Sequence, residues 1–106
     1  MAAPSLDSVA HAIADPTRRQ ILDQLRDSGP QRAGDIAARF ARISRPAVSK
    51  HLRVLRGSRL VLQERRGREL WYRLDPAPLS QFETWLQKYS NFWHGKLEDL
   101  KKTAEK

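Results

Sequence analysis

The predicted fold depends on the stretch Ile43-Ser44-Arg45-Pro46-Ala47-Val48-Ser49-Lys50-His51-Leu52-Arg53-Val54-Leu55. Its apolar side chains recur at the three- and four-residue spacing of a helix, so that Val48, Leu52 and Leu55 share one side. Ser44 is a favoured N-cap residue, and a proline is tolerated in the first helical turn. We therefore expect a helix that begins at Ser44 and ends near Gly57.

The residues before this helix complete a helix-turn-helix pattern. A shorter helix with one apolar side is predicted over residues 33–40, and residues 41–43 form a short turn. Residues 33–57 then have the order of elements that helix-turn-helix DNA-binding proteins use.

The polar side of the second helix carries residue types that contact DNA. Arg45 can hold a guanine edge bidentately, and small apolar residues can touch a thymine methyl group. Hydroxyl and ammonium groups can reach a base edge or a phosphate. The expected DNA contacts of this helix are Ser44, Arg45, Pro46, Ala47, Ser49, Lys50 and Arg53. The alternative is an ordinary amphipathic helix with a solvated polar side.

A basic hairpin is predicted directly after the helix-turn-helix. Two alternating stretches within residues 60–74 have the pattern of strands, and Gly67 supplies the positive φ that a tight turn requires. Arg65, Arg66 and Arg68 cluster at the tip. Such a ribbon is a wing that lies along phosphates or inserts an arginine into a narrow minor groove. The alternative is a turn that only aids solubility.

Helices are also predicted at both ends of the chain. Residues 5–14 and 16–27 form two amphipathic helices, and residues 79–100 form a long helix with a heptad-like apolar side. An isolated monomer would expose this side, which favours dimerisation over packing within one chain. The fold class is mainly α with a β-hairpin: a winged helix-turn-helix of five helices and a two-stranded wing, in one domain over residues 1–106.

The composition agrees with a small soluble domain that binds a polyanion. The chain has 106 residues and a net charge of +8, with 40% hydrophobic and 30% charged residues. Residues 31–74 hold twelve Lys and Arg against three acidic residues, so the net charge lies in this segment. The chain has no run of about 20 apolar residues for a membrane span and no secretory signal, so we expect a cytoplasmic protein without membrane contact.

Three stretches resemble the ArsR family of winged-helix transcriptional regulators: residues 14–22 (Ala-Asp-Pro-Thr-Arg-Arg-Gln-Ile-Leu), residues 43–55 and residues 72–76 (Tyr-Arg-Leu-Asp-Pro). The resemblance extends over nearly the whole chain. It implies a homodimeric repressor that binds a near-palindromic operator in double-stranded DNA and often controls its own operon. One departure is Arg59, which stands where the family commonly has a glycine ahead of the wing.

The resemblance also implies that the first and last helices, residues 5–14 and 79–100, form the dimer interface. The heptad-like side of the last helix agrees with this. The expected dimer contacts are Leu6, Val9, Ile13, Leu79, Phe82, Leu86, Tyr89, Trp93, Leu97 and Leu100.

Metal sensing, which many relatives perform, is not expected. The chain has no cysteine, which excludes a thiolate site. His94 and Glu98 are spaced to share a helix face, so zinc coordination is geometrically possible, but the second histidine of the family's site is missing. We expect a member without metal or cofactor, whose effector the sequence does not identify.

Other function classes receive less support. The sequence has no recognisable pair of catalytic acids, no Ser–His–Asp set and no glycine-rich phosphate loop, so an enzyme is not expected. The alternative function is a winged-helix architectural protein, or a protein- or RNA-interaction module, without operator specificity.

Overall fold

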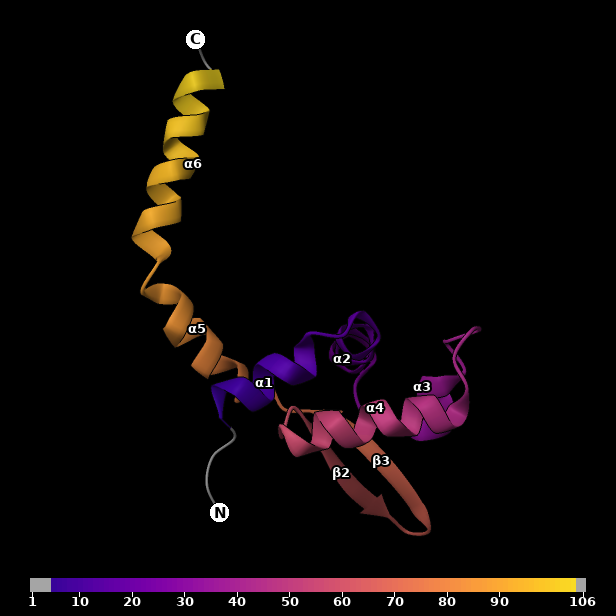
Figure 1. The fold of residues 1–106 in the computed structure, drawn as a ribbon. Coiled ribbons are helices and arrows are strands. Elements are labelled where there is room, and N and C mark those ends of the chain that lie inside the picture. The colour runs from indigo at the N-terminus through magenta and orange to yellow at the C-terminus, as the bar shows by residue number, and fades with distance from the viewer. Residues whose placement is uncertain (1–4, 105–106) are drawn as a thin grey trace.

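A computed structural model describes residues 5–104, which form six helices and a three-stranded sheet. Helices α1 to α4 and the sheet form a body, and α5 and α6 extend from it as an arm (Figure 1). The predicted winged helix-turn-helix is confirmed, with α3 and α4 as its two helices and β2 and β3 as its wing. The elements are α1 (Leu6–Ile13), α2 (Pro16–Ser28), β1 (Gln31–Arg32), α3 (Ala33–Ala37), α4 (Arg45–Gly57), β2 (Val61–Arg66), β3 (Glu69–Leu74), α5 (Leu79–Gln87) and α6 (Ser90–Ala104).

The hydrophobic core lies where the helices of the body meet β2. The predicted apolar side of α4 contributes Val48, Leu52 and Leu55, each no more than 2% exposed. Burying one such side chain is worth about 1.5–3 kcal/mol relative to leaving it exposed. The buried apolar residues are Val9, Ala12, Ile21, Leu22, Leu25, Ile36, Ala37, Val48, Leu52, Leu55, Leu60 and Val61.

Val9 of α1 is fully buried in this core. The structure therefore contradicts the expectation that Val9 contacts a second copy of the chain. Its side chain faces the interior of its own protomer, and no surface of it is left for a partner.

The predicted hairpin is confirmed, and a third strand joins it. β2 and β3 pair antiparallel from Val61↔Leu74 to Arg66↔Glu69, and Gly67 has a φ of 63° in the turn. β1 pairs antiparallel with the other edge of β3, so the order is β1-β3-β2. Sequence reasoning missed β1 because two residues are too few to show alternation.

The prediction of one long helix over residues 79–100 is wrong. α5 ends at Gln87 and α6 begins at Ser90. At the break, the N–H groups of Lys88 and Tyr89 donate to the carbonyls three residues back instead of four, at 3.3 and 2.9 Å. The Ser90 hydroxyl donates to the Gln87 carbonyl at 2.9 Å. A serine that bonds to the backbone competes with the helix, and a heptad pattern does not register this competition.

α3 is shorter than predicted, because it ends at Ala37 instead of Phe40. The N–H groups of Arg39 and Phe40 donate to carbonyls three residues back, at 3.3 and 3.0 Å, so the chain continues in tight turns. Phe40 nevertheless packs against the core, which explains why its apolar spacing resembles a continued helix.

α4 ends in a left-handed turn at Arg59, whose φ is 63°. The N–H of Leu60 donates to the Leu55 carbonyl at 3.1 Å, and the N–H of Arg59 donates to the Arg56 carbonyl at 3.0 Å. This is the Schellman arrangement, which normally places glycine at the left-handed position. Gly57 lies two residues too early, within α4, so an arginine adopts the left-handed backbone.

Replacing Arg59 by glycine should raise the free energy of unfolding by about 1 kcal/mol, because left-handed backbone costs a residue with a Cβ about 1–2 kcal/mol. The control is Arg56→Gly, the same chemical change inside α4, which should lower the free energy of unfolding by about 1 kcal/mol. Urea unfolding followed by circular dichroism measures both. Equal destabilisation by the two substitutions would contradict this account of the turn.

Candidate nucleic-acid interface

α4 is held by its apolar side, and its polar side faces solvent. The helix begins where the Ser44 Oγ accepts a hydrogen bond from the Ala47 N–H at 3.2 Å. Ala47 itself is half-buried. The other predicted contact residues of this helix lie exposed along one edge: Ser44, Arg45, Pro46, Ser49, Lys50 and Arg53.

The guanidinium of Arg45 lies over α3 at Gly34. A Cβ atom at position 34 would lie 2.9 Å from Arg45 Nη2, a separation shorter than Cβ atoms show in real proteins. The bare backbone of Gly34 therefore lets the Arg45 guanidinium lie in this position, and a side chain at residue 34 would make it shift. Sequence reasoning missed Gly34, since the space that a glycine leaves becomes apparent only when the residue opposite it is known.

The tip of the wing presents the three predicted arginines, Arg65, Arg66 and Arg68, all exposed. Arg65 and Arg66 belong to opposite faces of the hairpin, because successive residues of a strand alternate. The Arg66 guanidinium carbon lies 4.6 Å from the centre of the Trp71 ring. Its Nη2 lies 3.4 Å from Glu64 Oε2. These two contacts place the Arg66 guanidinium over the Trp71 ring and beside Glu64.

Arg32 of β1 connects the wing to α3. Its Nε donates to Asp35 Oδ2 in α3 at 3.0 Å, and its Nη1 donates to Glu69 Oε2 near the wing tip. Its guanidinium also lies 5.8 Å from the centre of the Trp71 ring. The hydrogen bonds with Glu69 and Asp35 raise the pKa of Arg32 above its ordinary value. Sequence reasoning counted Arg32 only as charge, because its partners come from distant parts of the chain.

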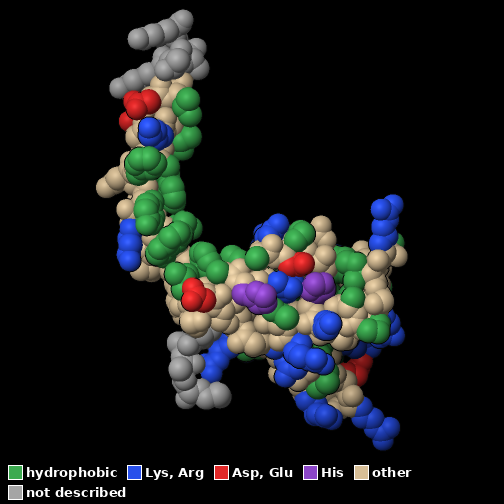
Figure 2. Space-filling view, viewed as in Figure 1, with side chains coloured by type: hydrophobic (Ala, Val, Ile, Leu, Met, Phe, Trp, Pro, Cys, Tyr) green, Lys and Arg blue, Asp and Glu red, His purple; other side chains and the backbone are tan. Residues whose placement is uncertain are grey.

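The main basic surface of the protein and its main apolar surface lie on different parts of the molecule. Figure 2 shows Lys and Arg side chains gathered over α4 and the wing, while hydrophobic side chains run along α5 and α6. The pairs that Arg32 and Arg66 make with acidic residues are exposed, so each adds little to stability. The basic surface is the electrostatic feature expected of a protein that binds a polyanion.

The arm leaves an apolar surface uncovered. The radius of gyration is 17.6 Å, whereas a compact chain of this length has about 13 Å. Of the predicted dimer contacts, Leu6, Ile13, Leu79 and Phe82 are half-buried at the root of the arm. Sequence reasoning left Trp85 and Phe92 out of that set. The exposed large apolar residues of the arm are Trp85, Leu86, Tyr89, Phe92, Trp93, Leu97 and Leu100.

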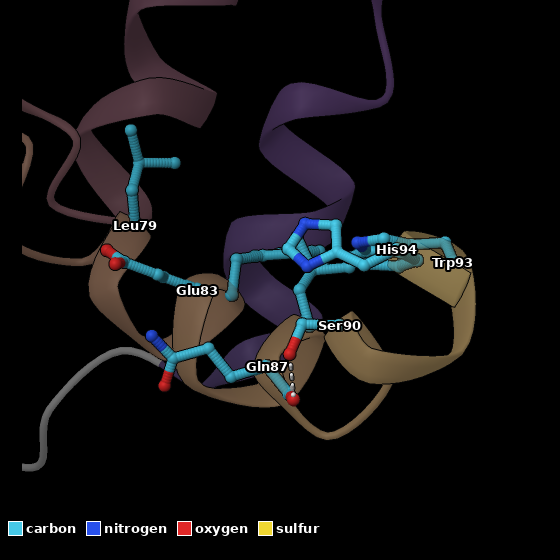
Figure 3. Close-up of a pocket in the computed structure, with 8 residues that line it drawn as sticks. Leu79, Glu83, Gln87, Ser90, Trp93 and His94 are labelled. Carbon is cyan, nitrogen blue, oxygen red and sulfur yellow. Dashed lines mark hydrogen bonds between the residues drawn. The ribbon is translucent and has the colours of Figure 1, made fainter. Parts of the chain in front are cut away.

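A groove of about 470 Å³ follows the junction of α5 and α6. Figure 3 shows Trp93 and His94 on its α6 side, with Leu79, Glu83 and Gln87 on its α5 side. Across the part of the chain whose side chains the structure describes, no group of three His, Asp or Glu residues is close enough to hold a metal ion. Within residues 5–104, no helix is long and apolar enough to cross a bilayer.

Comparison with known proteins identifies the family. Residues 15–62 match the model of the bacterial regulatory proteins of the arsR family. The chain is 38% identical over 86 residues to the transcriptional repressor SdpR of Bacillus subtilis, an alignment that spans 81% of this chain and 93% of SdpR. It is 42% identical over 85 residues to the HTH-type transcriptional regulator Rv2034 of Mycobacterium tuberculosis, which spans 80% of this chain and 78% of Rv2034.

Comparison with solved structures leads to the same family. An ArsR-like transcriptional regulator from Rhodococcus sp. RHA1 superposes with a TM-score of 0.74 at 37% identity, covering 94% of this chain and 90% of that protein. Residues 15–62, which match the family model, include α4 and the start of the wing. The exposed edge of α4 carries the predicted DNA contacts. The chain therefore belongs to the arsR family of bacterial regulatory proteins, and it is a winged helix-turn-helix DNA-binding transcriptional regulator rather than an enzyme.

Proposed function

We propose that the protein is a homodimeric repressor in which each protomer inserts α4 into a major groove of its operator. The exposed edge of α4, from Ser44 to Arg53, supports this role, because its residues are directed away from a helix side that is fully buried. Two recognition helices of a dimer meet half-sites about 34 Å apart on the same face of the duplex. Such an operator is near-palindromic, and we propose that it includes the promoter of the protein's own operon.

The wing serves as the sequence-independent part of this interface. Its three arginines lie at the end of a ribbon, and arginine binds phosphate bidentately. In the free protein, the Arg66 guanidinium already lies at the tip of the wing, against Trp71 and Glu64. We infer that the wing fixes the orientation of the protein on the duplex and that α4 reads the bases.

Dimerisation through the arm explains its exposed apolar surface. Large contiguous apolar patches are rarely exposed on monomers and mark interfaces. Covering the arm with the arm of a second copy buries Leu86, Trp93 and their neighbours without using the basic surface. We also propose that the protein acts in the cytoplasm, where a bacterial regulator meets its operator.

Replacing Arg45 by alanine tests whether α4 reads bases. We expect it to weaken binding to the operator by about 1–3 kcal/mol and to relax sequence preference, because a bidentate base contact is lost. Fluorescence anisotropy with operator and shuffled duplexes measures both effects. The control is Arg26→Ala, which removes the same charge from α2, where Arg26 pairs with Asp23 and Asp27. Equal weakening of both duplexes by Arg45→Ala would refute base reading by this residue.

Replacing Arg66 by alanine tests the wing. It should weaken binding to operator and shuffled duplexes by similar factors, since a phosphate contact carries no sequence information. The slope of log affinity against log salt concentration should fall by about one unit, because one fewer counterion is released. A salt titration of the variant beside the wild type measures the slope. An unchanged slope would remove Arg66 from the phosphate contacts.

Replacing Trp93 by aspartate tests the interface. Trp93 is 37% exposed in the groove of the arm, and a carboxylate there would be desolvated in a dimer. Sedimentation velocity should show a monomer for Trp93→Asp and a dimer for the conservative Trp93→Phe. A folded Trp93→Asp variant that still sediments as a dimer would show that the interface lies elsewhere.

A further inference from the structure

Arg18 lies where three helices meet, near the start of α2. Its Nε donates to the Ala12 carbonyl at 2.7 Å, and its Nη2 donates to the His11 carbonyl at 2.9 Å, both at the end of α1. Its Nη1 lies 3.4 Å from Nδ1 of His51 on α4. One planar guanidinium therefore bridges α1 and the recognition helix.

The local sequence places Arg18 at this position. Asp15 Oδ1 accepts hydrogen bonds from the N–H groups of Thr17 and Arg18 at 2.8 and 3.1 Å, which fixes the start of α2 directly after α1. Burial raises the pKa of Asp15, but the two N–H groups and the nearby side chains of His51 and Arg18 together lower it by more, so that its pKa lies below the ordinary value. The last carbonyls of α1 have no partners within the helix, and a cation is favoured at that end.

The contact between Arg18 and His51 has a defined donor. Arginine only donates hydrogen bonds, so in this contact the Arg18 Nη1 is the donor and Nδ1 of His51 stands in the acceptor position. His51 is half-buried between the core side and the exposed edge of α4. Its ring therefore connects Arg18 to the helix that carries the candidate DNA contacts.

Arg19 provides the comparison. Its Nη1 donates to the Ile13 carbonyl at 2.7 Å, so it also binds the end of α1. No hydrogen bond from its exposed side chain to α4 is present among residues 5–104. The two neighbouring arginines thus share the capping role, and Arg18 alone of the two also bridges to α4.

α1 belongs to the part of the molecule that leads into the arm. It packs against α5 (Figure 1). Its buried side chains Val9 and Ala12 fix it in the core. Apolar contacts between helices are non-directional, so they resist separation better than sliding. A planar donor group with partners on both helices resists sliding as well, because its hydrogen bonds depend on direction.

We propose that Arg18 is a positioning residue that fixes the recognition helix relative to α1 and thereby sets the distance between the two α4 helices of the dimer. This inference rests on the proposed homodimer. The distance matters because operator half-sites are spaced by whole base pairs, each about 3.4 Å along the duplex axis. A dimer whose recognition helices move by that amount no longer selects one spacing.

The experiment measures the α4–α4 distance directly. Because the chain has no cysteine, Ser49→Cys introduces one spin-label site per protomer on the exposed edge of α4. Pulsed electron–electron double resonance on the protein then gives the distribution of distances between the two spin labels. The labelled background is combined in turn with Arg18→Gln, Arg19→Gln, His51→Ala and His51→Gln.

We expect a single narrow distance in the labelled background and in its Arg19→Gln variant. Arg18→Gln and His51→Ala should shift or broaden it by about 3 Å or more, one base-pair step. His51→Gln, which keeps an acceptor, should restore most of the narrow distribution. Loss of stability alone does not change this distance, because the signal comes from folded dimers.

Four results would overturn the inference. The first is an Arg18→Gln variant with the same distance distribution as the labelled background. The second is equal broadening by Arg18→Gln and Arg19→Gln, and either result would leave Arg18 with no role beyond capping α1. If Arg18→Gln does not fold, a narrow distribution for His51→Ala overturns it. A labelled background that gives no distance between labels contradicts the proposed homodimer itself, and the inference falls with it.

Discussion

The burial of one side of α4 is the constraint on which the rest of the structure depends. Val48, Leu52 and Leu55 are enclosed by contacts from α1, α2, α3 and β2, so the helix cannot rotate without exposing them. Rotation is therefore opposed by several kcal/mol of lost burial, on the scale of about 1.5–3 kcal/mol per side chain. Because the apolar side is fixed inward, the polar side from Arg45 to Arg53 is fixed outward.

The same constraint separates the two surfaces of the molecule. Basic side chains lie on the exposed edge of the helix-turn-helix and at the tip of the wing. Arg32 connects these two parts through its hydrogen bonds to Asp35 and Glu69. The apolar side chains that the small core does not cover lie on the arm instead. A regulator of this family needs a surface for DNA, and the division leaves the arm free for the proposed second copy without competition for the basic surface (Figure 2).

The sequence predicted those parts of the fold that local patterns determine. α1, α2, α4 and the β2–β3 hairpin follow from apolar periodicity, from the caps Asp15 and Ser44, and from the turn at Gly67. The exposed edge of α4 and the tip of the wing are also predictable, because a helix with one buried side must present the other. The family followed from the same residues.

Features that depend on distant partners were not predictable. β1 exists because β3 offers it an edge. The break between α5 and α6 has a local cause instead, because the Ser90 hydroxyl binds the Gln87 carbonyl, but the apolar spacing from which the helix was predicted does not register this bond. Val9 is buried because several helices converge on it, although its spacing matches an interface residue equally well. The roles of Gly34, Arg32 and Arg18 likewise arise from contacts between elements, which no single stretch of sequence contains.

The measurement that tests the account most directly is binding of the wild-type protein to the duplex upstream of its own gene and to a shuffled duplex, across a salt series. Fluorescence anisotropy should show preference for the upstream duplex by a factor of about 10³ or more at moderate salt, saturating at one dimer per site. Equal affinity for both duplexes, with parallel release as salt rises, would contradict a sequence-specific repressor and favour an architectural role for the basic surface.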